Sequence, residues 1–200
     1  QEMQIAARIQ AQLLPVNTPQ MSNLGIATFM KPAKEVGGDY YDFISYDNTH
    51  LGILIGDVSG KGLPAGMIMI IANAIIKIVA HKTFDTKKII IDFSREMFNK
   101  MRPGSFMTFN YLVWDTDTRQ LHYTGAGHEH ILWYQQESNS VKSVKAGGMA
   151  VGLIEDVEPY ALSKALNTKP GDIIVLYTDG ITEAMNSDGK RYTIDRLVES

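Results

Sequence analysis

The stretch that most constrains the fold is residues 51–66, LGILIGDVSGKGLPAG, in which a short apolar run leads into an aspartate, a glycine-rich turn and a proline. The run 51–55 has the length and β-branched content of a buried strand. The glycines allow backbone conformations closed to other residues, and Pro64 suits the first turn of a helix. The pattern predicts a strand, a turn and a helix, with the carboxylate of Asp57 at the strand end.

Three interpretations of Asp57 compete. In the first it caps a polar turn, in the second it belongs to a nucleotide-binding P-loop, and in the third it binds a hard metal ion together with nearby backbone carbonyls. A P-loop has four residues between its glycines and a Ser or Thr after its lysine. Here only three residues separate Gly56 from Gly60, and a glycine follows Lys61. Spacing therefore excludes the P-loop and leaves the other two open.

Composition narrows the class of protein. The 200 residues fit one domain, and the net charge of −3 gives no basic footprint for nucleic acid. The absence of cysteine excludes disulfides, thiolate zinc sites and thiol-based phosphatases or proteases. The most apolar run, 63–80, contains Asn73 and Lys77 and is shorter than the roughly 20 residues of a membrane span. We expect a cytoplasmic chain with no membrane span in this segment, cut from a longer protein.

Periodicity predicts the order of the elements. The helix 64–81 is apolar on nearly every face, so we expect it to be buried against a sheet. A run of strands, a pair of helices and a second run of strands predicts an α+β sandwich and argues against a βαβ array. The full set is a helix over 2–14, strands near 24–31, 38–46 and 50–57, helices near 64–81 and 86–101, and strands near 106–114, 120–126, 130–135, 141–145, 159–165 and 172–177.

Three aspartates, Asp39, Asp57 and Asp179, lie beside glycine at or next to the ends of apolar strands. Each alone is a weak signal, because Asp and Gly are ordinary turn residues. If the strands are neighbours, the three carboxylates meet, and like charges then raise one another's pKa. Divalent cations would neutralise such a cluster, and all-oxygen ligands favour Mg²⁺ or Mn²⁺ over zinc. Such ions acidify water and hold it for in-line displacement at phosphorus.

Five ordered motifs carry a family resemblance: KPAKEVGGDYYDF, ILIGDVSGKGLPAG, FMTFNYLVWD, LHYTGAGHEHILWY and LYTDGITEA. Together they resemble the bacterial SpoIIE-type branch of the PPM metal-dependent protein phosphatases, to which RsbU-type stress-response regulators belong. The resemblance runs from the opening QLLP to the end of the chain. It implies a four-layer αββα sandwich of two antiparallel sheets flanked by helices.

The resemblance also implies an activity and a site. The activity is hydrolysis of phosphoserine or phosphothreonine on a partner protein by metal-activated water, with two Mn²⁺ or Mg²⁺ ions and no phosphoenzyme. Asp39 resembles an acidic ligand that binds metal directly or through water, and Asp57 resembles the carboxylate that bridges both ions. Val58 falls where the family uses a backbone carbonyl, and Asp179 where it uses a further metal aspartate.

Partners and domain limits follow from the same resemblance. The implied substrate is a phosphorylated regulator of the anti-anti-sigma-factor kind, in stress-response signal transduction. Residues 1–15 are expected to form a helix, either lying on its own domain or ending an upstream sensor or dimerisation region. Residues 16–200 are expected to form a phosphatase domain shortened at its carboxyl end, since the family's last Asp-rich motif, with one ligand of the second metal, is absent.

Other residues keep alternatives open. His128 and His130 would share a face of a strand; a zinc pair lacks a third ligand, so we favour a structural or cleft-rim role for His128. Asp115 and Asp117 follow a strand as in aspartyl-phosphate enzymes, but a hairpin turn is the better interpretation. Lys61 either attracts a phosphate or is a solvated loop lysine. The alternative function for the whole chain is a catalytically weak or inactive partner-binding module.

Overall fold

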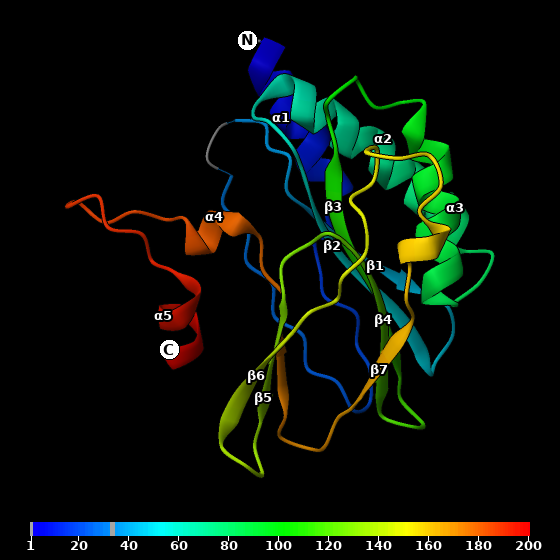
Figure 1. Cartoon of the computed structure of the whole chain (residues 1–200), viewed down its shortest axis with the longest axis vertical. Coiled ribbons are helices and arrows are strands. Elements are labelled where there is room, and N and C mark those ends of the chain that lie inside the picture. Colours follow the sequence, from blue (N-terminus) through cyan, green and yellow to red (C-terminus); the bar gives the residue numbers. More distant parts are fainter. Residues whose placement is uncertain (1, 33–34) are drawn as a thin grey trace.

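A computed structural model describes residues 2–32 and 35–200 of the chain (Figure 1). Most of the elements expected from periodicity form within a few residues of their expected limits. In chain order they are α1 Glu2–Leu13, β1 Tyr40–Ser45, β2 His50–Val58, α2 Leu63–Ala80, α3 Thr86–Phe98, β3 Met107–Asp115, β4 Gln120–Ala126, β5 Ile131–Gln135, β6 Ser140–Val144, the 3₁₀ turn Glu158–Tyr160, β7 Lys164–Asn167, β8 Ile173–Val175, α4 Asp179–Thr182 and α5 Ile194–Glu199.

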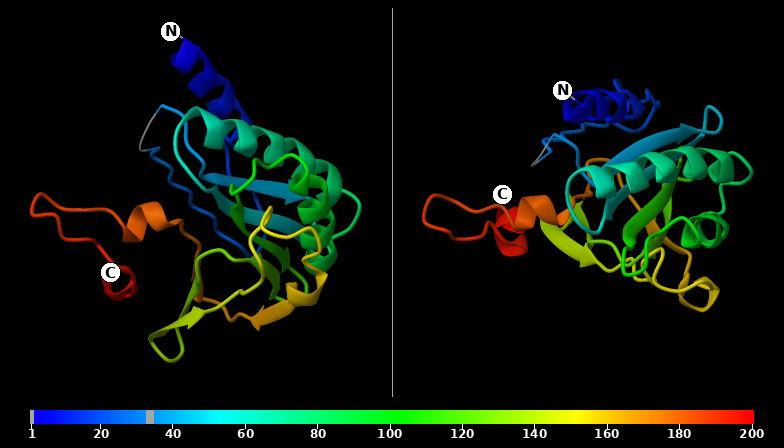
Figure 2. Two further views of the ribbon diagram at one scale, coloured as in Figure 1. Left: turned by 45° about the horizontal axis from the view of Figure 1, so that its top comes forward. Right: turned by 90° about the horizontal axis from the view of Figure 1, so that it is seen from above.

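The strands form two antiparallel sheets, which confirms the predicted α+β sandwich. One sheet has five strands in the order β1-β2-β3-β4-β7, and the other has three in the order β6-β5-β8. Helices α2 and α3 lie side by side over one face of the five-stranded sheet, while the segment after β8 extends away from both sheets (Figures 1 and 2). The chain crosses from the first sheet to the second between β4 and β5, through the connection that contains His128.

Helix α2 supplies much of the core between the helices and the five-stranded sheet. Its buried face includes Met69 and Ile76, both 0 % exposed. The opposite face is not buried, contrary to the prediction, because only one side of a surface helix can contact the sheet: Leu63, Met67, Ile71 and Ile78 are 36 to 64 % exposed. Among the described residues α2 is the single helix long and apolar enough to cross a membrane, and half of that stretch is buried inside the protein.

Helix α1 packs on α2, and buried polar groups join the two helices to β1. The carboxylate of Asp42, 4 % exposed, accepts hydrogen bonds from Tyr40 at 2.9 Å and Asn73 at 3.2 Å. The Lys77 ammonium lies 3.0 Å from the same oxygen, and Asn73 also reaches the Leu13 carbonyl at 3.4 Å. A buried charge needs such partners. The two polar residues of the otherwise apolar α2, Asn73 and Lys77, both contact the Asp42 carboxylate.

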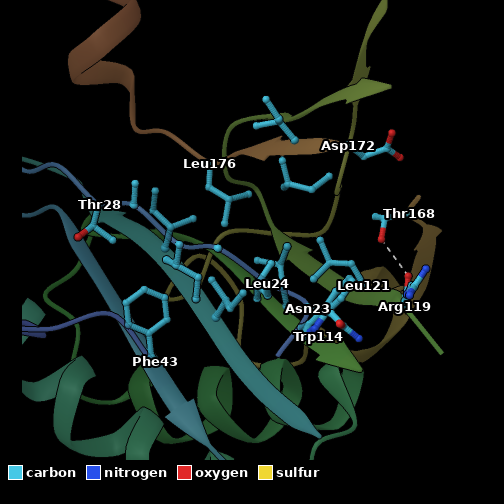
Figure 3. A pocket seen from close by; sticks show the side chains of 18 of the residues that line it. Asn23, Leu24, Thr28, Phe43, Trp114, Arg119, Leu121, Thr168, Asp172 and Leu176 are labelled. Atoms are coloured by element: carbon cyan, nitrogen blue, oxygen red, sulfur yellow. Dashed lines mark hydrogen bonds between the residues drawn. The ribbon is translucent and has the colours of Figure 1, made fainter. Parts of the chain in front are cut away.

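The strand expected near 24–31 does not form, and the prediction was wrong. A strand needs a hydrogen-bonded neighbour, and the described residues of this stretch make only the isolated bridge between Met21 and Leu24. They line a cavity of about 650 Å³ between the two sheets, into which Phe43 and Leu176 also face (Figure 3). The strand expected near 159–165 is likewise displaced, since a 3₁₀ turn precedes β7.

The contact between α2 and the loop before β1 depends on Gly66. A β-carbon there would lie 2.0 Å from Val36 Cγ1 and 3.3 Å from Gln10 Nε2. Alanine in a helix interior is intrinsically better than glycine by about 1 kcal/mol. Val36 is 1 % exposed and has no room to yield. The clash should therefore outweigh the helix preference of alanine and make the substitution destabilising.

We therefore expect Gly66→Ala to lower the free energy of unfolding by about 1–3 kcal/mol, measured by urea denaturation. Gly25→Ala is the matched control, because a β-carbon at Gly25 has no atom within 4 Å. It should change the stability by less than about 0.5 kcal/mol. A stabilised Gly66→Ala variant would contradict the close approach.

Candidate metal centre

Strand pairing brings the first two aspartates together. In the β1–β2 ladder Tyr40 pairs with Gly56. Asp39 precedes Tyr40 and Asp57 follows Gly56, so the antiparallel register carries both residues to the same end of neighbouring strands. Asp179 lies outside both sheets: it is the exposed first residue of α4, which follows shortly after β8 of the second sheet.

The three carboxylates act on one another electrostatically. Burial raises the pKa of Asp57 to about 7, and the negative charges of Asp39 and Asp179 add to the rise. A hydrogen bond from the Val58 amide and the charge of Lys61 oppose it. Burial also raises the pKa of Asp39, and the charge of Asp179 adds to that rise. Mutual repulsion of this kind is expected of carboxylates gathered without a counter-charge.

Gly38 leaves the oxygen atoms of this site uncovered. A β-carbon at Gly38 would lie 2.6 Å from the Val58 carbonyl oxygen and 3.0 Å from Asp57 Oδ1. The Val58 amide donates to the Gly38 carbonyl at 3.3 Å, which holds the two backbones together. Only glycine therefore fits between Asp39 and this pair of oxygens, and the gap it leaves is lined by a carboxylate and a carbonyl.

The donor set fits a hard divalent cation, because carboxylate and carbonyl oxygens are the ligands that Mg²⁺ and Mn²⁺ prefer. Within residues 2–32 and 35–200, however, no three acidic, imidazole or thiol side chains lie close enough to hold one ion together. The ligand roles of Asp39, Asp57, Val58 and Asp179 stay predictions.

The two histidines do not form a pair. His128 is 8 % exposed; its Nε2 lies 3.1 Å from the Tyr177 carbonyl oxygen and its Nδ1 lies 2.8 Å from Thr108 Oγ1. His130 Nδ1 instead contacts Ser143 Oγ at 2.8 Å, in an exposed position. These separate partners support the structural interpretation of His128 over a zinc pair.

Asp115 forms the hairpin turn that the sequence favours. Its Oδ1 accepts the amides of Asp117 at 2.9 Å and Thr118 at 3.2 Å, between β3 and β4. These hydrogen bonds lower the pKa of Asp115. The carboxylate is therefore engaged as the cap of a turn.

Several residues around the site were missed by sequence reasoning. Gln10 of α1 donates to the Gly37 carbonyl at 2.7 Å and accepts the Gly37 amide at 3.1 Å, which fixes the loop before Asp39. The Thr178 side chain hydrogen-bonds to Asp39 and lowers its pKa, against the effect of burial. The double glycine before Asp39 was a local signal for Gly38, whereas nothing local distinguishes Gln10 or Thr178.

Comparisons with known proteins agree with this architecture. The family described as Stage II sporulation protein E (SpoIIE) matches residues 47–200. The phosphoserine phosphatase RsbU of Bacillus subtilis is 31 % identical over 200 residues, covering 99 % of this chain and 59 % of RsbU. The SiaA-PP2C domain of Pseudomonas aeruginosa has a TM-score of 0.79 at 22 % identity, over 99 % of this chain and 79 % of that one.

A structure of RsbX in complex with magnesium has a TM-score of 0.57 at 20 % identity, over 74 % of this chain and 69 % of that one. The present chain thus spans about three fifths of RsbU, and the structural likenesses concern the fold. The SpoIIE match covers well over half of the residues. The chain therefore belongs to the SpoIIE family, the SpoIIE/RsbU-type branch of the PPM serine/threonine protein phosphatases.

Proposed function

We propose that this chain hydrolyses phosphoserine or phosphothreonine on a regulatory partner protein, with Mn²⁺ or Mg²⁺ held by Asp39, Asp57, Asp179 and the Val58 carbonyl. The observation that carries the proposal is that Gly38 leaves the Asp57 carboxylate and the Val58 carbonyl uncovered beside Asp39, where the charges of Asp39 and Asp179 add to the burial that raises the pKa of Asp57. The magnesium complex of RsbX supports a divalent cation, and the SpoIIE family supports protein phosphatase activity.

The residues of the chain divide the work between them. When bound, divalent ions supply Lewis acidity that lowers the pKa of water and neutralises phosphoryl charge. The charges of Asp39 and Asp179 both raise the pKa of Asp57, which suits a residue that both ions would share. Lys61, close enough to lower the pKa of Asp57, is placed to attract the phosphate dianion. Water adds to phosphorus, the bond to the serine oxygen breaks, and that oxygen takes up a proton.

The wider setting is also a proposal. The two hydrogen bonds between Gln10 and Gly37 support a role for α1 as the link between an upstream sensor or dimerisation region and the site. The proposed substrate is a phosphorylated regulator of the anti-anti-sigma-factor kind, and the proposed location is the cytoplasm. Residues 1–15 would then be the end of the linking region and residues 16–200 the phosphatase domain.

Asp57→Asn should lower Mn²⁺-dependent phosphate release from a phosphoserine protein by at least about a hundredfold, because it removes a charge that the reaction needs. Asp115→Asn is the matched control: it removes a carboxylate but keeps the oxygen that caps the hairpin. Its activity should stay within about threefold of wild type, since Asp115 lies in a turn.

Three results would contradict the proposal. A covalent phosphate trapped on Asp115, with activity lost in Asp115→Asn, would indicate an aspartyl-phosphate enzyme. Tight partner binding with no turnover in Mn²⁺ would indicate a binding module. Undiminished turnover in Asp57→Asn would remove the site altogether.

The pH dependence of stability gives a test that needs no substrate. A folded-state pKa of about 7 for Asp57, against 3.8 for an ordinary aspartate, means that the metal-free native state binds more protons than the unfolded chain. This contribution to stability is present at low pH and is lost as pH rises toward and through 7. Divalent metal reverses the trend, since it binds the ionised carboxylates and releases their protons.

We therefore expect chelator-treated wild type to lose melting temperature between pH 6 and 8 relative to Asp57→Asn. Mn²⁺ should restore the wild type more at pH 8 than at pH 6. His128, whose pKa burial lowers to about 4, makes stability fall with decreasing pH below about 6.5. Both proteins contain His128, so the comparison cancels it. Parallel melting curves for the two proteins would show that Asp57 is not perturbed.

A further inference from the structure

His128 occupies the connection through which the chain leaves one sheet for the other. It lies between the end of β4 and the start of β5 and is 8 % exposed. Its ring reaches both sheets: Nδ1 contacts Thr108 Oγ1 of β3 at 2.8 Å, and Nε2 contacts the Tyr177 carbonyl oxygen, just beyond β8, at 3.1 Å. One imidazole thus spans the gap between the sheets at the end that carries the aspartates.

The two partners assign the tautomer of the ring. A backbone carbonyl can only accept, so His128 Nε2 must carry the hydrogen that faces Tyr177. In the neutral ring Nδ1 is then an acceptor, and the Thr108 hydroxyl donates to it. The opposite tautomer would set two lone pairs against each other at 3.1 Å. Burial lowers the pKa of His128 to about 4, so the ring is neutral, with a donor toward the second sheet and an acceptor toward the first.

Both partners of His128 lead directly to the candidate ligands. Thr108 pairs with Asp57 across β2 and β3, and its hydroxyl lies 3.4 Å from the Asp57 carbonyl oxygen. Tyr177 precedes Thr178, whose side chain hydrogen-bonds to Asp39, and Asp179 follows. Among the described residues, no hydrogen bond to the exposed Asp179 carboxylate is found, so the position of Asp179 depends on the segment that carries it.

We propose that His128 is a positioning residue that holds the Tyr177–Asp179 segment against β3 and so sets where Asp179 stands relative to Asp57 and Asp39. The proposal rests on the proposed function only in taking these carboxylates as metal ligands. Truncating His128 leaves Asp39 and Asp57 in place but frees the segment that carries Asp179. The affinity for Mn²⁺ should then fall more than the turnover at saturating Mn²⁺ does.

A histidine that merely fills a core would give a different result. Its loss would lower stability, while the properly folded fraction would bind metal as tightly as wild type. Metal affinity of the folded protein therefore separates positioning from packing, and thermal stability of the chelated protein reports packing alone.

The test uses two substitutions of His128 that differ in reach. Glutamine can place an N–H near the position of Nε2 and keep the hydrogen bond to Tyr177, whereas asparagine is too short. Thr108→Val removes the hydroxyl at nearly constant shape, and Thr108→Ser retains it. His130→Gln, two residues along the same connection and only half-buried, is the control. Mn²⁺ affinity is measured by isothermal titration calorimetry, alongside turnover at saturating Mn²⁺.

We expect His128→Asn and Thr108→Val each to weaken Mn²⁺ binding about tenfold or more, as loss of a partner that orients a ligand usually does. Thr108→Ser and His130→Gln should stay within about threefold of wild type, whereas His128→Gln, which keeps the hydrogen bond to Tyr177 but lacks the acceptor for the Thr108 hydroxyl, should lose less affinity than His128→Asn. Turnover at saturating Mn²⁺ should fall much less than affinity. The double variant His128→Asn/Thr108→Val should be no worse than the single ones, because both break one connection.

Unchanged Mn²⁺ affinity in folded His128→Asn, with only its melting temperature reduced, would overturn the positioning role. Equal losses in the Gln and Asn variants would also overturn it, since the hydrogen bond to Tyr177 would then not matter. A wild type that binds Mn²⁺ but hydrolyses no phosphoserine would refute the proposed function and leave the His128 comparison intact. A wild type that binds no Mn²⁺ would refute both.

Discussion

The repulsion between Asp39, Asp57 and Asp179 is the constraint on which the arrangement of this chain depends. Carboxylates raise one another's pKa when they are gathered without a counter-charge, and the charges of Asp39 and Asp179 add to the burial that raises the pKa of Asp57 to about 7. The surrounding packing opposes this repulsion: β1 and β2 are fixed in register by the sheet, and Gly38 lets two backbones approach where any side chain would collide.

The support for the site comes from groups far away in the sequence. Gln10 hydrogen-bonds to Gly37 across 27 residues, and His128 reaches Tyr177 across 49. Each is a buried polar side chain with hydrogen-bond partners, as buried polar atoms require: Gln10 has the backbone of Gly37, and His128 has the Tyr177 carbonyl and the Thr108 hydroxyl. The loop that carries Asp39 and the segment that carries Asp179 are thus each held by a side chain from a distant part of the sequence. Neither segment is a regular strand at the point where its aspartate lies.

Local pattern was sufficient for most of the fold. Alternation and apolar runs located β1 to β5, and the glycine-proline punctuation around residues 56–64 located the start of α2. The failures share one physical cause: a strand or a buried face depends on a neighbour that local sequence does not identify. The stretch near 24–31 had the residues of a strand but found no ladder partner among the described residues. Local sequence likewise does not show that Asp42 is buried, because its partners Lys77 and Asn73 come from a helix more than 30 residues away.

The outward face of α2 has an energetic consequence. Folding uses one side of this helix, while Leu63, Met67, Ile71 and Ile78 on the other side stay in water. Every square ångström of that surface retains roughly 25 cal/mol of transfer free energy that folding has not released. This free energy stays available to association: whatever comes to cover the face gains it without first having to deform the sheet beneath.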